Sequence, residues 1–212
     1  MATVLTAPEQ KIVLHNVSWE TYERLLDERG DHSVPRFNFD RGDLEIMSPS
    51  SEHEECKFAL ARIVDVVAEE LNLNTRGLGS TTLKREDIER GFEPDACYYI
   101  QSYARMRGRR RIDMLVDPPP DLIIEIDITT DSMKKLGLYA AFGVPEVWRY
   151  DGNRVIILEL DGGRYVERDT SVALPLLTAV GLTNLVEESN SLEPMPWLRK
   201  LRNWVREQAA QA

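Results

Sequence analysis

Hydrophobic residues recur with two different periods along the chain, and the changes of period predict where helices and strands lie. A helical period begins at Ser18 and ends at Gly30. The two-residue period of a strand then runs on both sides of a turn at 40–42, which predicts a hairpin over 34–47. Roughly the first ten residues show neither period, and we expect them to be loose.

A longer helix is expected after Pro49. Ser51 and Glu54 have the spacing of a capping box, and the helical period continues to a predicted end near Asn74. Its apolar face should be buried, with a histidine at the N-terminal end, where the helix can point it into a cleft. This face contains His53, Cys56, Leu60, Val64 and Val67.

The most apolar segment, 121–128, follows three prolines. Because it is rich in β-branched residues and nearly continuous, it predicts a central strand covered on both faces. Strands are also expected at 75–83 and 94–100, with a polar loop at 84–91 between them. A helix capped by Thr130 or Asp131 should follow the central strand and end at Phe142. Later predicted elements are strands at 147–150, 154–160 and 165–168 and an amphipathic helix over 195–209.

This mixed order of helices and strands predicts an α/β (α+β) domain, a central mixed β-sheet flanked by helices. We assign 1–17 to an N-terminal tail, 18–190 to a single domain and 191–212 to the amphipathic helix. That helix carries more apolar residues than a loose tail needs. It should therefore pack on the domain or form a dimer contact, and we expect a homodimer.

Composition changes this picture little. The chain has 212 residues, 42% of them hydrophobic and 29% charged, as in ordinary globular proteins. Cys56 and Cys97 match no zinc motif and suit a reducing compartment. The chain starts without the pattern of a signal peptide, and no apolar run reaches the roughly 18 residues of a membrane span. We therefore expect a cytoplasmic protein without membrane contact.

Charge is distributed unevenly. Acidic residues outnumber basic ones by 36 to 26, which gives a net charge of −10 and argues against a broad nucleic-acid-binding surface. One basic cluster interrupts this excess, in the connection between the strands at 94–100 and 121–128. We expect it to contact DNA phosphates near the site; the alternative is a solvated loop or a salt-bridged subunit surface. The cluster consists of Arg105, Arg107, Arg109, Arg110 and Arg111.

Two carboxylates stand inside the apolar strands, Glu125 in the central strand and Asp95 at the start of its predicted neighbour. A buried carboxylate is costly unless it is paired or bound to metal. Asp121 lies about 13 Å from Glu125 along the strand, too far to share an ion, whereas Asp95 can lie about 5 Å away across strands. Asp95 and Glu125 are thus expected to bind Mg²⁺, or Mn²⁺ as a substitute. Alternatively, Glu125 forms a buried salt bridge with an arginine or lysine.

Several short motifs occur in a characteristic order. They are Met-Ser-Pro at 47–49 followed by His53, Glu-Pro-Asp at 93–95, Pro-Asp-Leu-Ile-Ile-Glu-Ile at 120–126, Lys-Leu-Gly-Leu-Tyr at 135–139 and Gly-Val-Pro-Glu-Val-Trp-Arg-Tyr-Asp at 143–151. Over roughly residues 18 to 185, this order resembles the Uma-two family of restriction endonucleases in the PD-(D/E)XK superfamily.

The resemblance implies a restriction-endonuclease-like fold and a Mg²⁺-dependent endonuclease that hydrolyses DNA without an organic cofactor. Asp95 matches the aspartate of the PD motif and Glu125 the acidic residue of the (D/E)XK element. The superfamily's lysine position, two residues after that acid, holds Asp127. In this family the next helix is thought to supply the lysine, which would be Lys135; spacing alone does not exclude Lys134.

Three further residues are weaker candidates. His53 is as consistent with a structural as with a catalytic role, and Glu54 is a possible additional metal ligand. Tyr139, one turn after Lys135, can reach the site but is expected to pack. Two other functions stay open because of Asp127, the displaced lysine and the negative charge. One is a catalytically silent protein that binds nucleic acid or a protein partner, and the other is a different metal- or carboxylate-dependent hydrolase.

Overall fold

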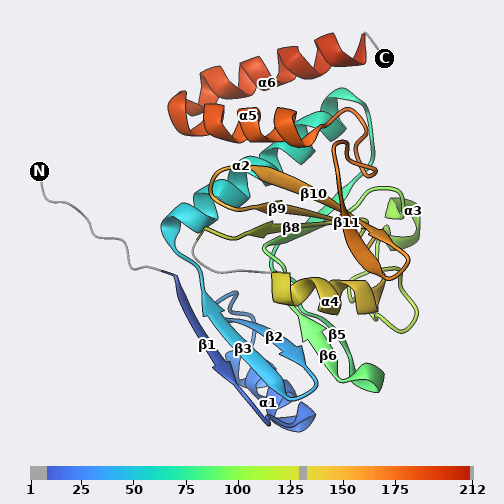
Figure 1. The fold of residues 1–212 in the computed structure, drawn as a ribbon. Coiled ribbons are helices and arrows are strands. Elements are labelled where there is room, and N and C mark those ends of the chain that lie inside the picture. Colours follow the sequence, from blue (N-terminus) through green and yellow to red (C-terminus); the bar gives the residue numbers. More distant parts are fainter. Residues whose placement is uncertain (1–8, 129–132, 211–212) are drawn as a thin grey trace, which may run out of the picture.

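The computed structural model describes residues 9–128 and 133–210, with Met133 and Lys134 lacking described side chains. A six-stranded sheet has the order β11-β10-β9-β8-β7-β4, and within it β8 and β9 run parallel while the other neighbours are antiparallel (Figure 1). The predicted fold class, a mixed sheet flanked by helices, is confirmed. Its strands are β4 (Arg76–Leu78), β7 (Ala96–Tyr99), β8 (Leu122–Ile126), β9 (Glu146–Tyr150), β10 (Val155–Asp161) and β11 (Arg164–Arg168).

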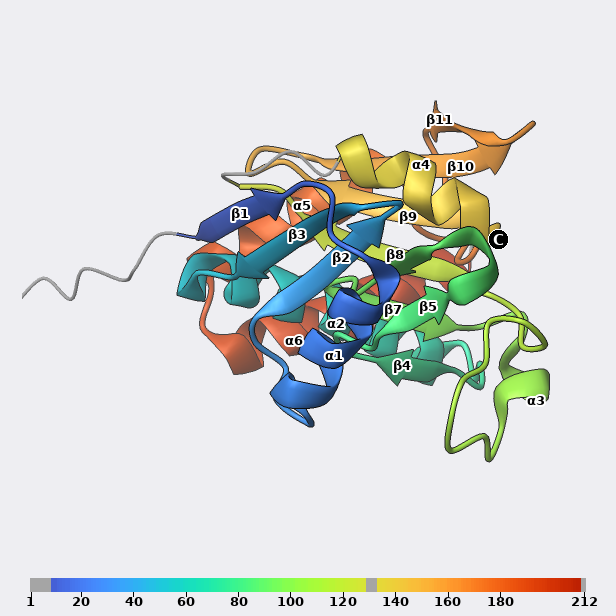
Figure 2. The ribbon, with the colours of Figure 1, turned by 90° about the horizontal axis from the view of Figure 1, so that it is seen from below.

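A second, antiparallel sheet of five strands has the order β1-β3-β2-β6-β5. The hairpin of β2 and β3 was predicted, but the sheet built around it was not. One strand lies inside the predicted tail, and two short ones lie in and beside the predicted polar loop. Figure 2 shows α1 (Trp19–Arg29) against this sheet. Its strands are β1 (Gln10–Leu14), β2 (Arg36–Asp40), β3 (Asp43–Ser48), β5 (Leu83–Arg85) and β6 (Arg90–Phe92).

Helices cover both faces of the larger sheet (Figure 1). On one face lie α2 (Ser51–Glu70), α5 (Ala179–Ser191) and α6 (Pro194–Ala209), and on the other lies α4 (Met133–Phe142). A short helix, α3 (Tyr103–Met106), stands at one edge. The structure therefore gives each face of the sheet its own apolar layer.

Strand β8 is buried throughout, as the apolar run predicted. Leu122, Ile124 and Ile126 pack with residues of α2, α5 and α6, whereas Ile123 packs with residues of α4. Because successive side chains of a strand point to opposite faces, Glu125 shares the α4 face with Ile123. The burial of both faces explains why this segment carries almost no polar residues, and it directs the one glutamate toward α4.

Several predicted boundaries are wrong by a few residues. The N-cap of α2 is Ser50, whose Oγ accepts from the His53 N–H at 3.2 Å, so the capping box predicted at Ser51 does not form. The helix ends at Glu70 rather than near Asn74. The strand predicted over 75–83 is divided between the two sheets, as β4 and the first residue of β5. The predicted caps of α4, at 130 and 131, fall outside the described residues.

The C-terminal helix α6 belongs to the domain core. Trp197, Leu201 and Val205 are buried within the cluster that includes α2 and α5, and Trp197 Nε1 donates to the Leu185 carbonyl at 3.0 Å. The apolar stripe predicted for this helix is thus used within the chain, partly against α5, a helix that the sequence pattern did not reveal. Within 9–128 and 133–210, no helix combines the length and apolar character needed to span a membrane.

Both cysteines are free and buried, and we expect them to be unreactive in the native protein. Burial raises the pKa of the Cys56 thiol to about 11, helped by Glu52 and Glu55, and that of Cys97 to about 12. At pH 8 neither should react with a disulfide reagent such as DTNB until urea unfolds the chain, since only the thiolate attacks. Rapid labelling of Cys97 in the native state would contradict this burial.

The same shifts predict how stability depends on pH. An unfolded cysteine has a pKa of about 8.5, so below that pH both states keep the thiol proton. Above it the unfolded chain releases the proton first, and stability should fall as pH rises toward the folded values of about 11 and 12. Urea midpoints at pH 8 and pH 10, compared with those of a Cys97→Ser variant, would measure this contribution.

Candidate active site

The structure brings Asp95 and Glu125 together across neighbouring strands. The antiparallel register of β7 and β8 pairs Ala96 with Ile124, and one further step sets Asp95 opposite Glu125. The Ile126 N–H donates to Asp95 Oδ2 at 2.7 Å, which holds the aspartate beside the end of β8. Each of the two side chains is about 1% exposed. The juxtaposition expected from strand alternation therefore exists, in a site shielded from water.

Helix α4 supplies two partners to Glu125. Lys135 Nζ donates to Oε2 at 2.9 Å, and the Tyr139 hydroxyl donates to Oε1 at 2.5 Å. These residues stand one turn apart, so they present their side chains on one face of the helix. The structure thus brings Lys135 of α4 into contact with Glu125, and its role as the lysine of the family stays a prediction. Tyr139 packs edge-on against Phe92, as expected, but it also bonds to the site, which the packing prediction missed.

The charges around Lys135 keep it protonated. Its burial alone would lower the lysine pKa, but the carboxylates of Glu125 and then Glu45 outweigh burial and raise it. Glu45 Oε1 lies 3.9 Å from Lys135 Nζ. Burial, reinforced by the Glu125 charge, also raises the pKa of Tyr139 well above its usual value, so this hydroxyl remains a donor. Glu125 is therefore held between a cation and a neutral hydroxyl.

Asp95 is held by a different pair. Its Oδ1 accepts from Arg36 Nη1 and lies 2.7 Å from His53 Nε2. Arg36 Nη2 in turn donates to Glu54 Oε1 at 2.7 Å. His53 is fully buried, and its Nδ1 lies 3.4 Å from Glu9 Oε2. His53 thus reaches the site from the buried end of α2, as its position on the helical face allowed.

Arg36 was not singled out in the sequence. It is buried at the start of β2, a strand of the second sheet, and its partner Asp95 lies 59 residues away. The only sequence signal was a charged residue at the edge of an alternating strand pattern, which is common at strand ends. Contacts of this range depend on how the two sheets meet, and sequence periodicity does not show that.

The ligands available for a divalent ion are two carboxylates. Across the described residues, no group of three or more His, Cys, Asp or Glu side chains is arranged to hold a metal ion. Mg²⁺ is commonly bound by one or two carboxylates together with water and phosphate oxygens, and Asp95 with Glu125 fits that kind of site. Glu54 is already bonded to Arg36 and to Lys57, so its candidacy as a further ligand gains no support.

Asp127 stands at the superfamily's lysine position, but its side chain is engaged elsewhere. It forms an ion pair with Arg149 of the neighbouring strand β9, while its charge adds to the field that keeps Lys135 protonated. A carboxylate at this position is therefore compatible with a lysine donated by α4. The alternative lysine, Lys134, has no described side chain.

The arginine cluster is not brought to the site. Its five side chains, in α3 and the loop after it, are all exposed. This connection leaves β7 after Tyr99 and enters β8 at Leu122, which are the strand ends opposite Asp95 and Glu125. Asp95 and Tyr99 are four residues apart, which is about 13 Å at the rise of a strand. The cluster thus lies toward the ends of these strands that are far from Asp95 and Glu125, and its contact with DNA phosphates stays a prediction.

Comparison with known proteins finds a family and a solved structure that the chain resembles. The family model Uma2, described as "Putative restriction endonuclease", matches residues 19–188. The chain belongs to the Uma2 family. A search of the curated proteins finds no match. Family membership supports a nuclease function for this Uma2 chain and agrees with the resemblance seen in its motifs.

A solved structure resembles this Uma2 protein as a whole. It is a crystal structure from Anabaena variabilis described as a "putative nuclease belonging to DUF820". It superimposes with a TM-score of 0.51 at 13% sequence identity, and the match covers 89% of this chain and 99% of that one. At such low identity the similarity supports the nuclease-like fold alone.

Proposed function

We propose that this protein is a metal-dependent endonuclease that hydrolyses DNA phosphodiester bonds. Asp95 and Glu125 would hold Mg²⁺, with Mn²⁺ as a substitute. The observation that carries the proposal is the set of three groups at one point: two opposed, buried carboxylates and the Lys135 ammonium 2.9 Å from one of them. Phosphodiester hydrolysis needs charge stabilisation and an activated water, and a divalent ion supplies both when it is bound.

The protein's own residues would prepare the site for an anionic substrate. Lys135 is charged, buried and already oriented, so it can stabilise negative charge developing on a phosphate without reorganisation. Tyr139 fixes one oxygen of Glu125 and leaves the carboxylate a single orientation. His53 and the Ile126 N–H do the same for the two oxygens of Asp95. Burial of these groups strengthens each electrostatic contact by excluding water.

The first test is plasmid cleavage. Purified protein should nick supercoiled plasmid in Mg²⁺ or Mn²⁺ but not in EDTA, and the Glu125→Ala variant should lose this activity. Circular dichroism would confirm that the variant is folded. Equal background from both proteins in every metal would remove the endonuclease proposal. Parallel reactions with small phosphoesters would detect a different hydrolase on the same scaffold.

One observation favours a catalytically silent protein that binds nucleic acid or a protein partner. Arg36 and Lys135 already neutralise the two carboxylates, so the site is electrostatically balanced without an ion. In that case the protein should show no heat of binding with Mg²⁺ or Mn²⁺ in calorimetry. A metal-binding isotherm lost in Asp95→Asn would instead support the enzyme.

Three finer proposals accompany the endonuclease. The arginine cluster would contact DNA away from the cleaved bond, the protein would be cytoplasmic, and it would act as a homodimer. Because the apolar stripe of α6 is buried within the chain, a dimer would need another surface. A stable monomer in light scattering would contradict the homodimer proposal.

A further inference from the structure

A cleft of about 980 Å³ opens beside the candidate site. Asp95 and Arg36 line it, together with the first turns of α2, residues 33–34 before β2 and residues 77–80 around the end of β4. Its volume is in the range of small-ligand pockets, about 300–1,000 Å³. A space of this size accommodates a few nucleotides of one strand.

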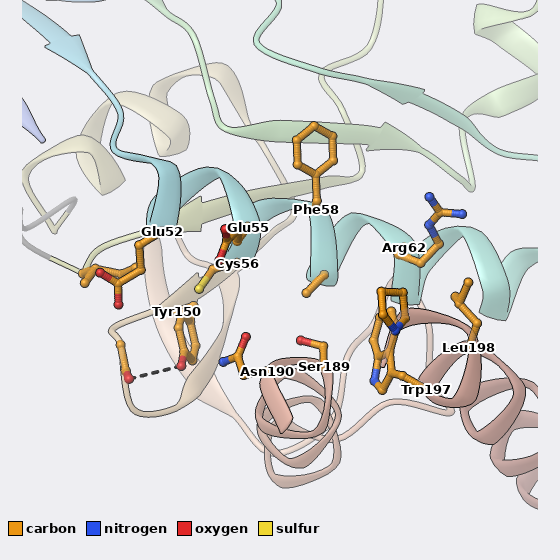
Figure 3. A pocket seen from close by; sticks show the side chains of 14 residues that line it. Glu52, Glu55, Cys56, Phe58, Arg62, Tyr150, Ser189, Asn190, Trp197 and Leu198 are labelled. Atoms are coloured by element: carbon orange, nitrogen blue, oxygen red, sulfur yellow. Dashed lines mark hydrogen bonds between the residues drawn. The ribbon is translucent and has the colours of Figure 1, made fainter. Parts of the chain in front are cut away.

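An exposed aromatic side chain stands in the wall of this cleft. Phe58 of α2 is 65% exposed, although the helix buries the neighbouring Ala59 and Leu60. Phe58 also lines a neighbouring pocket with Trp197 and Leu198, and Figure 3, which draws that pocket, shows the Phe58 ring projecting outward from α2. Lys57 Nζ lies 4.8 Å from the centre of the ring. An exposed ring beside a cation is the arrangement that proteins use to stack an unpaired base and bind its phosphate.

A chain of ionic contacts links Phe58 to Asp95. Lys57 bonds to Glu54, Glu54 to Arg36, and Arg36 to Asp95. Among the residues that the structure describes, the buried Arg36 Nε has no hydrogen-bond partner. A buried donor without a partner is costly, and an oxygen of a bound phosphate would satisfy it. The cleft therefore has one cation beside the ring and another beside the candidate catalytic carboxylate.

The remaining charges of the cleft favour one strand over two. Glu55 and Asp65 line it without bonding to Lys57 or Arg36, so the cleft keeps negative charge after the ionic contacts are made. A duplex carries one phosphate charge per about 1.7 Å, twice the density of a single strand. Repulsion from these carboxylates acts on a single strand as well but penalises a duplex more, so stacking on Phe58 has to supply much of the binding free energy.

We propose that this cleft binds the unpaired nucleotides of a nucleic-acid strand, with a base stacked on Phe58 and phosphates bound by Lys57 and Arg36. The inference rests on the proposed function in taking nucleic acid as the substrate, and it adds the substrate class: single-stranded segments. The shared chemistry is an unpaired base with its phosphate, which DNA and RNA both offer.

The test is oligonucleotide binding by the wild-type protein in EDTA, which prevents metal-dependent cleavage. Fluorescence anisotropy would compare a labelled single-stranded oligodeoxynucleotide, the matched duplex and the matched oligoribonucleotide. We expect the single strand to bind at least tenfold more tightly than the duplex. Phe58→Ala should weaken single-strand binding by about tenfold or more, and Phe58→Trp should retain it. Val180→Ala, at an equally exposed apolar residue of α5, is the control and should change nothing.

Four outcomes would overturn the inference: no binding to any oligonucleotide, equal or tighter binding of the duplex, unchanged affinity in Phe58→Ala, or an equal loss in Val180→Ala. Tighter binding of the oligoribonucleotide would support the proposed nucleotide-binding cleft and identify RNA as its preferred ligand. The result is separable from plasmid cleavage. Phe58-dependent binding without plasmid cleavage would support the cleft proposal and contradict the endonuclease proposal. Plasmid cleavage with binding that does not depend on Phe58 would support the endonuclease proposal and contradict the cleft proposal.

Discussion

Replacing Lys135 by methionine should reduce metal-dependent DNA cleavage by at least about a hundredfold and destabilise the fold as well. Within the described part of the chain, Lys135 is the one cation bonded to Glu125. Its loss removes the charge that would stabilise the phosphate and leaves a buried carboxylate with only the Tyr139 hydroxyl. Removing one partner of a buried ion pair costs about 3–5 kcal/mol. Plasmid nicking rates and urea denaturation would measure the two effects.

A double variant separates these effects. Glu125→Gln in the Lys135→Met background replaces the stranded carboxylate by an amide that can still accept from Tyr139. Stability should then recover most of the loss, because no buried charge remains, while cleavage stays absent. Nicking by Lys135→Met at the wild-type rate would show that the lysine is only structural. Recovery of cleavage in the double variant would contradict the role of Glu125.

Glu93→Ala is expected to destabilise the protein by about 3–5 kcal/mol, a large share of the roughly 5–15 kcal/mol typical of a folded protein. Glu93 is buried and accepts from both terminal nitrogens of Arg29, at 2.5 and 2.6 Å. It also accepts from the Phe37 N–H at 2.8 Å. One carboxylate thereby ties α1 and β2 to the segment that enters β7. Without it, the mostly buried Arg29 guanidinium loses its counterion and keeps the Pro35 carbonyl as an acceptor, and the buried Phe37 N–H loses its acceptor.

An exposed ion pair provides the matched control. Glu23 of α1 accepts from Lys84 at 2.7 Å, but both side chains are 40% exposed. Solvent screens such pairs, so Glu23→Ala should cost less than about 1 kcal/mol. Equal urea midpoints for Glu93→Ala and Glu23→Ala would show that the buried contact contributes no more than a surface pair. Because Glu93 lies two residues before Asp95, its loss should also lower nicking activity.

The central strand and its carboxylate could be predicted because their signals are local. The apolar run predicts that β8 is buried, and the one glutamate within it predicts a carboxylate whose burial costs free energy. Both signals lie in a single segment. The spacing of neighbouring strands identified Asp95 as the partner of Glu125, and the structure has the register that sets them opposite each other. The role of Lys135 came from a family resemblance rather than from spacing, and its 2.9 Å bond to Glu125 supports it.

The errors have a common physical origin. The capping box at Ser51 failed because Ser50 offers the same side-chain chemistry one residue earlier. Strands β5 and β6 have three residues each, too few to show a period. Tyr139 was expected to pack, and a packed ring is compatible with a hydroxyl that reaches a carboxylate. In each case the deciding factor was a contact with a neighbouring residue or strand, which hydrophobic periodicity does not report.

The sequence by itself determined the elements with strong periods, the mixed sheet, the opposed pair Asp95 and Glu125, and the family. These depend on hydrophobic alternation and on the cost of a buried charge, both of which act within a few residues. Only the tertiary structure decided that a second sheet brings Arg36 to Asp95 and that the arginine cluster lies at the far strand ends. It also decided that Phe58 stands in the cleft. Those placements come from the packing of segments that are distant in the chain, and the local hydrophobic pattern does not predict such packing.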